Sequence, residues 1–273
     1  MLWYILMGVE IKIPDGKGRY IANHNPGSRA IRTPDGTRLS ISVPQNFDEL
    51  RSAWKVLEDY TGRVALNPES KLQDLDDIRK VREYHFGKNF GYVVFSAVDG
   101  ENRPQAMATA EIVPVRSLVD RKIARGKGIS FIYQGAHTPG VSQNDTNFSV
   151  FSQLYKVLSG ELLPEISKYK GDKWLGAIAE SRSSGPELEA ILNAGFEEIV
   201  PNEFYRPPAV QKVRRRENQF TTDLILLGRG IPKDPKLREL AAEAYVRAAY
   251  CEGQNINPTL RAINQYFSAR KSS

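Results

Sequence analysis

Two glutamates interrupt apolar, strand-like stretches of the sequence and could act as general bases. Glu111 lies in the alternating segment Gln105–Val115, and Glu180 directly follows the apolar run Leu175–Ala179. A carboxylate in such surroundings can take a proton from an attacking group or orient a substrate. Glu180 is the stronger candidate, because the carboxyl ends of strands are where an α/β sheet opens its crevice. For each glutamate the alternative is an ordinary solvated or paired carboxylate.

The segment from Gly135 to Ser142 lies between an expected strand and an expected helix and consists mainly of small residues. Free amide groups at a helix N-terminus suit a pyrophosphate, because the helix dipole favours negative charge there. We therefore predict an anion-binding loop with four members: Thr138, Gly140, Val141 and Ser142. His137 is the one histidine in this loop, either as a functional group or as a structural or solvated side chain.

Two glycine features near this loop have competing interpretations. Gly135 interrupts a β-branched and aromatic stretch, which indicates a bulge, a close backbone approach, or simply the end of the strand. The run Arg125-Gly-Lys-Gly-Ile129 has nearly the composition of a phosphate loop, but it precedes a strand rather than a helix. We interpret it as a hairpin turn.

Several other chemistries find no support in the sequence. It contains no nucleophile elbow, no zinc-protease helix motif and no Walker-type loop. With three scattered histidines and one cysteine, we expect no metal site and no internal disulfide. That cysteine, Cys251, lies among small and aromatic residues and is interpreted as a packing residue. The single cysteine also favours a reducing, cytoplasmic location, and the apolar stretch 1–7 is too short for a membrane span.

The positive charge of the chain is concentrated near its C-terminus. The formal net charge is +6, and residues 209–273 hold twelve Lys and Arg against six Asp and Glu. The sharpest basic run offers four cations: Lys212, Arg214, Arg215 and Arg216. Such a run could bind an acidic partner, either a carrier protein or a nucleic acid, and a solvated surface is the alternative.

The pattern of periodic segments and turns predicts an α/β protein. We expect strands at 37–43, 92–98, 105–115, 129–136, 174–179, 197–205 and 222–227, and helices at 46–62, 72–86, 147–164 and 184–194. Pro164 should kink or end the third of these helices. Asp234-Pro235 and Asn257-Pro258 should each begin a C-terminal helix.

This order of elements resembles the acyl-CoA N-acyltransferase (GNAT) superfamily, and the phrase Ala190-Ile-Leu-Asn-Ala-Gly-Phe196 resembles its helix ending. The resemblance covers about 190 residues and implies a mixed central sheet that opens beside two parallel strands to admit CoA. It implies that the strand carrying Tyr133, Gly135 and Ala136 pairs with pantetheine. The loop departs from the family's signature, because Gly140 is the only glycine inside it.

The resemblance also implies a reaction: transfer of an acyl group from acyl-CoA to an amine. The family's acid tyrosine would stand at Ile191, so Tyr133, Tyr205 or water would have to replace it. We expect an N-terminal strand and turn extension at 1–36, a GNAT-like domain at 37–230 and a C-terminal helical appendage at 231–273. A carrier-protein-dependent acyltransferase and a non-catalytic nucleic-acid-binding protein on a degenerate fold are the alternatives.

Overall fold

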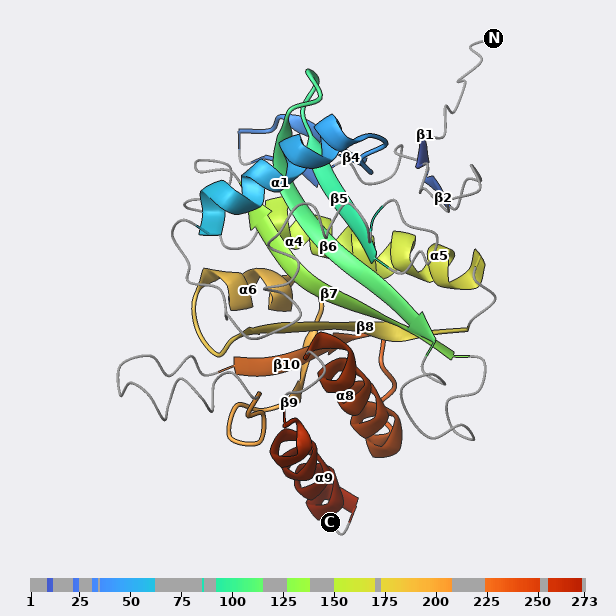
Figure 1. Ribbon diagram of the computed structural model, residues 1–273, viewed down its shortest axis with the longest axis vertical. Helices are drawn as coiled ribbons and strands as arrows, with labels where there is room; N and C mark the ends of the chain where they lie inside the picture. The colour runs from blue at the N-terminus through green and yellow to red at the C-terminus, as the bar shows by residue number, and fades with distance from the viewer. Residues whose placement is uncertain are drawn as a thin grey trace.

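A mixed β-sheet forms the centre of the molecule (Figure 1). The computed structural model describes residues 9–11, 22–24, 31–33, 35–61, 85, 92–114, 127–137, 150–169, 173–207, 224–250 and 255–271. Within these residues, eight strands follow the spatial order β3-β4-β5-β6-β7-β8-β10-β9, and β1 (Val9–Ile11) pairs with β2 (Ala22–His24) in a separate sheet. The eight strands are β3 (Ile31–Arg32), β4 (Arg38–Ser42), β5 (Tyr92–Val98), β6 (Pro104–Pro114), β7 (Lys127–His137), β8 (Lys173–Arg182), β9 (Glu197–Val200) and β10 (Leu224–Arg229).

The strands β7 and β8 are parallel neighbours, as the sequence predicted from the helix that connects them. Their pairing runs from Lys127 and Lys173 to Ile132 and Ala179. Beyond these residues, within the described part of the chain, β7 continues beside β6 and β8 continues beside β10, without further pairing between β7 and β8. The two strands therefore part in the middle of the sheet, and the predicted fold class is confirmed.

A bulge in β7 lies at the point of parting. Thr109 of β6 is opposite Gln134, and Ala110 is opposite Ile132, so Tyr133 is the extra residue. The extra residue shifts the alternation of side chains beyond it. Gly135 consequently faces the helix behind the sheet, where an added Cβ would lie 2.0 Å from Phe151 Cε2. The bulge is thus at Tyr133, and Gly135 permits a close helix approach.

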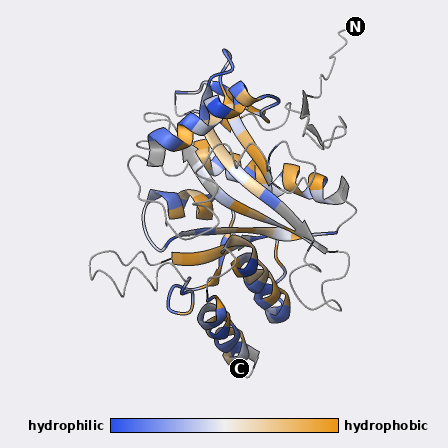
Figure 2. Ribbon diagram, viewed as in Figure 1, coloured by the Kyte–Doolittle hydropathy of each residue, from blue (hydrophilic) through white to orange (hydrophobic). Residues whose placement is uncertain are grey.

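Helices cover both faces of the sheet. One face packs against α1 (Phe47–Thr61), α8 (Pro235–Ala249) and α9 (Asn257–Lys271), which share a single hydrophobic cluster with the strands. The other face packs against α4 (Val150–Val157), α5 (Leu163–Tyr169) and α6 (Pro186–Asn193). Figure 2 shows apolar residues along the strands and polar residues on the outer sides of α1, α8 and α9. The C-terminal helices thus form part of the main core.

Two of the predicted helix starts are confirmed by their capping hydrogen bonds. The Asn46 side chain accepts from the backbone N–H of Glu49 at 2.9 Å, and Asp234 accepts from Lys236 N–H at 2.8 Å. The start predicted at Ser184 is wrong. There α6 begins after Gly185, at φ 107°, and no side chain caps it. That conformation is open to glycine and gives the chain a sharper entry than a serine cap would.

Pro164 and Pro201 lie near two element ends that the sequence predicted. The helix does not end at Pro164, because a π-helical turn at Leu158–Leu162 joins α4 to α5. There the N–H of Leu163 donates to Leu158 O, five residues earlier instead of the usual four. This wider turn comes just before Pro164, which has no backbone N–H to donate. Conversely, the strand expected to reach Tyr205 ends at Val200, because Pro201 begins a turn.

The buried histidine His85 has a structural role. Its Nε2 lies 2.8 Å from Pro44 O, and its Nδ1 accepts from Val94 N–H at 3.3 Å. Burial lowers the pKa of His85, so the ring is neutral and ties two backbone segments together. The rest of the helix predicted at 72–86 lies outside the described residues, as do Arg125 and Cys251. No helix in the described ranges has both the length and the apolar character needed to cross a membrane.

Candidate active site at the parting of β7 and β8

Glu180 is the first residue of β8 beyond the last one that pairs with β7. Its partly buried carboxylate accepts hydrogen bonds from the hydroxyls of Tyr205 and Tyr250, the latter at 2.7 Å. Neither tyrosine comes from a sheet strand. Tyr205 follows the turn after β9, and Tyr250 directly follows α8. Two segments distant in sequence thus fix the position of one carboxylate at the opening.

The surroundings of Glu180 favour its protonated form. Burial raises the pKa of Glu180, and the two tyrosine hydrogen bonds partly oppose that effect. Glu187, at the start of α6, is also affected: burial and the negative charge of Glu180 outweigh Arg182 and raise its pKa to about 7. A carboxyl group with a raised pKa at a sheet opening, as Glu180 has, is characteristic of sites that transfer protons.

The second carboxylate–tyrosine pair lies on the adjacent strands. The hydroxyl of Tyr133 in β7 donates to Glu111 Oε2 of β6 at 2.6 Å. Glu111 is opposite Phe131, within the continuous pairing of β6 with β7. The bulge at Tyr133 therefore places a tyrosine next to Glu111. At Glu111 itself the sheet is continuous, because β6 is paired there with both β5 and β7.

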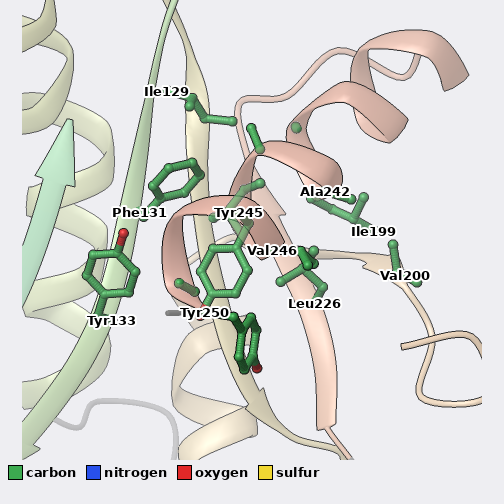
Figure 3. Packing of buried hydrophobic residues seen from close by; sticks show 14 of the residues in the cluster. Ile129, Phe131, Tyr133, Ile199, Val200, Leu226, Ala242, Tyr245, Val246 and Tyr250 are labelled. Atoms are coloured by element: carbon green, nitrogen blue, oxygen red, sulfur yellow. The ribbon is translucent and has the colours of Figure 1, made fainter. Parts of the chain in front are cut away.

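Between the two pairs lies Tyr245 of α8. Its ring is fully buried and meets Phe131 edge-on, with centroids 5.5 Å apart, and Tyr133 at 6.2 Å (Figure 3). Among the described residues, its hydroxyl has no hydrogen-bond partner. Burial raises the pKa of Tyr245 well above 10, and the nearby negative charge of Glu180 adds to that rise.

The structure therefore brings together four of the candidate residues as two pairs, Glu180 with Tyr205 and Glu111 with Tyr133. Gly135, Ala136 and His137 form the end of β7 beside the opening. Four loop candidates and the basic run lie outside the described residues: Thr138, Gly140, Val141, Ser142, Lys212, Arg214, Arg215 and Arg216. Their roles stay predictions. In the described segments, no group of histidines, cysteines and carboxylates could hold a metal ion.

Sequence reasoning missed Tyr245, Tyr250 and Glu187. The two tyrosines lie on or next to a terminal helix, and their relevance comes only from the packing of that helix against β7 and β8. Glu187 is visible in the sequence only as a residue near a helix start. For Tyr245 the one available signal was an aromatic residue on the apolar face of α8, and such a residue is equally typical of a core position.

Comparison with known proteins supplies structural neighbours but no family model and no curated protein that matches the sequence. The histone acetyltransferase HPA2 and related acetyltransferase from Corynebacterium glutamicum is 13% identical, with a TM-score of 0.43 over 71% of this chain and 97% of that one. A protein described as a phosphinothricin N-acetyltransferase is also 13% identical, with a TM-score of 0.44 over 71% of this chain and 99% of that one. The Vibrio cholerae spermidine N-acetyltransferase in complex with CoA and spermine is 10% identical, with a TM-score of 0.40 over 70% of this chain and 94% of that one.

Such low identities and TM-scores cannot transfer an activity or a substrate, so the assignment of the fold depends on the sheet itself. The sheet has one parallel central pair, antiparallel neighbours on both sides, and a parting next to a bulge. This arrangement agrees with the mixed sheet, open beside two parallel strands, that the sequence resemblance implied. Its core extends here to two C-terminal helices.

Proposed function

We propose that this protein transfers an acyl group from acyl-CoA to an amine at the parting of β7 and β8. The observation that carries the proposal is the position of Glu180, a carboxylate with a raised pKa at the mouth of an opened parallel pair. Amide formation from an ammonium requires a group that removes protons from nitrogen. A carboxylate with an elevated pKa is better matched to that task near neutral pH than an ordinary one.

The two tyrosines that donate to Glu180 would orient it rather than react. Tyr205 and Tyr250 both contact Oε2, so the carboxylate is held from one side by groups outside the sheet. Burial raises the pKa of both hydroxyls well above 10, which keeps their protons in place while Glu180 changes its protonation state. The proton from the amine would therefore reside on Glu180 and leave to solvent.

The parted end of β7 would bind the donor through its main chain. Past Ile132, the edge of β7 that faced β8 lacks a strand partner on that side within the described residues. An exposed strand edge is a template for an extended amide-containing ligand, and the pantetheine arm of CoA is such a ligand. We assign Tyr133, Gly135 and Ala136 to this edge and the loop 138–142 to the pyrophosphate, with Gly140→Val expected to weaken CoA binding.

An assay of thiol release tests the proposal. Acetyl-CoA and longer acyl-CoAs are incubated with the full chain and a panel of amines, and free CoA is trapped by a thiol reagent. We expect amine-dependent release by the wild type and loss of that release in Glu180→Gln. Release without dependence on any amine, or no release with any donor, would contradict the proposed function.

A further inference from the structure

The hydroxyl of Tyr245 differs from those of its tyrosine neighbours at the site. Tyr133, Tyr205 and Tyr250 each donate to a carboxylate, whereas the Tyr245 hydroxyl has no partner among the described residues although its side chain is 0% exposed. A buried hydroxyl without a hydrogen bond costs free energy, so its presence needs an explanation. A ligand that supplies the missing acceptor is one.

The ring that carries this hydroxyl is positioned by aromatic contacts with β7. The Tyr245 ring packs on Phe131 and Tyr133 of β7, at the bulge where the strands part. Because the bulge at Tyr133 directly follows the last residue of β7 that pairs with β8, the Tyr245 ring lies beside the opening between the two strands.

Resting on the proposed function, we propose that Tyr245 donates a hydrogen bond to the carbonyl oxygen of the bound thioester. As the amine nitrogen forms its bond to the carbonyl carbon, the electron pair of the C=O bond moves to that oxygen. The Tyr245 O–H then stabilises the negative charge. When the C=O bond re-forms, the C–S bond breaks and CoA leaves as the thiolate, while Glu180 holds the proton from the amine.

In this role Tyr245 keeps its proton throughout the reaction. A thiol has an ordinary pKa of about 8.5, well below that of the buried Tyr245 hydroxyl, so proton transfer from Tyr245 to the thiolate would be uphill. A fixed dipole aimed at a developing oxyanion needs no proton transfer. The helix α8 would thus contribute a catalytic residue to a site whose proposed base, Glu180, lies on the sheet.

The test compares Tyr245→Phe with Tyr250→Phe, each of which deletes one hydroxyl from a buried ring. We expect Tyr245→Phe to unfold at the same temperature as the wild type or higher, because the deleted group has no partner. Its kcat should fall about 100-fold to 1,000-fold, with acyl-CoA affinity changed much less and the pH profile unchanged in shape. Tyr250→Phe should unfold at a lower temperature, because it loses a bond to Glu180.

Each possible outcome decides the matter. If the wild type is active and Tyr245→Phe equally so, the inference fails while the proposed function stands. The inference also fails if Tyr245→Phe unfolds as early as Tyr250→Phe, because the hydroxyl is then structural, or if a basic limb of the pH profile disappears, because Tyr245 is then a proton donor. A wild type with no transferase activity overturns the proposed function and this inference with it.

Discussion

The molecule contains two carboxylate–tyrosine pairs of similar geometry in different parts of the sheet. Glu111 accepts from Tyr133 across the continuous pairing of β6 with β7, and Glu180 accepts from Tyr205 and Tyr250 where β8 has lost β7 as a neighbour. Both are partly buried glutamates on the face covered by α1, α8 and α9. The two glutamates differ in the strand pairing beside them rather than in the side chains that contact them.

That difference indicates which carboxylate can meet a substrate. Beside Glu111 both neighbouring strands are in place, since β6 pairs with β5 on one side and with β7 on the other. Beside Glu180 the pairing of β8 with β7 has ended and no other described strand takes its place, and burial raises the pKa of the carboxyl group. A raised pKa next to an opening is useful to a reaction, whereas a tyrosine–glutamate bond inside a continuous sheet mainly stabilises it.

The most direct way to break the comparison is to neutralise each carboxylate in turn. Glu180→Gln keeps the shape of the side chain but cannot take a proton, so we expect the acyl-transfer rate to fall by roughly 10²–10⁴. Glu111→Gln should cost less than about tenfold and show mainly as lower stability, since it weakens one hydrogen bond. Rates from initial velocities at saturating donor check both. Equal losses would remove the distinction between the two sites.

A second prediction concerns the parted end of β7. Gly135→Ala places a Cβ 2.0 Å from Phe151 and 2.9 Å from Tyr155, so α4 and β7 must move apart. We expect a loss of about 1–3 kcal/mol in the free energy of unfolding, measured with denaturant, and weaker donor binding. Gly100→Ala is the control, because its added Cβ meets nothing within 4 Å. A Gly135→Ala protein as stable as this control would contradict the packing described.

Removing one tyrosine from Glu180 should change the pH dependence of the reaction. The hydrogen bonds of Tyr205 and Tyr250 lower the pKa of Glu180, so Tyr205→Phe raises that pKa further. A general base works only when deprotonated, and the acidic limb of kcat/KM should therefore move to higher pH. Tyr133→Phe, which touches the other carboxylate, should leave that limb in place. A limb that moves in Tyr133→Phe alone would assign the base to Glu111.

The smallest effect we predict is on Glu187. Its folded-state pKa of about 7 exceeds the ordinary value of 4.5, so the folded protein binds this proton more tightly than the unfolded chain does. The resulting stability is complete below pH 4.5 and is lost as pH rises to about 7. Glu180→Gln removes a negative charge nearby and should lower the pKa of Glu187 below about 7, as an NMR titration of its carboxyl carbon can show.

Most of the sheet could be predicted from the sequence because its signals are local. The hairpin of β5 with β6 follows from alternation and a turn, and the parallel pairing of β7 with β8 follows from a helix between two apolar strands. The site was only partly predictable. Glu180 stood out at the end of an apolar run, but Tyr250 contacts it, and Tyr245 packs on β7 nearby, through the packing of α8, which no local pattern encodes.

The bulge at Tyr133 shows the same limit at the scale of one residue. The sequence left three interpretations of Gly135 open, namely a bulge, a close backbone approach or the end of the strand, and the extra residue of the bulge is an aromatic two positions earlier. The glycine is instead required by Phe151 and Tyr155 of a helix outside the strand. The register of a strand and its distance from a helix depend on the neighbouring strand and on that helix. The sequence of β7 alone therefore indicates an irregularity near Gly135 without showing which kind it is.

The central claim is that the parting of β7 and β8 binds an acyl donor. Titration of the isotopically labelled full chain with acetyl-CoA, followed by backbone amide NMR shifts, tests it without any substitution. We predict that the largest shifts fall on Tyr133–His137 of β7 and on Glu180–Arg182 of β8, with little change in β3 and β9 at the sheet edges. Saturating shifts centred on the edges instead, or no shifts at millimolar acetyl-CoA, would contradict the account.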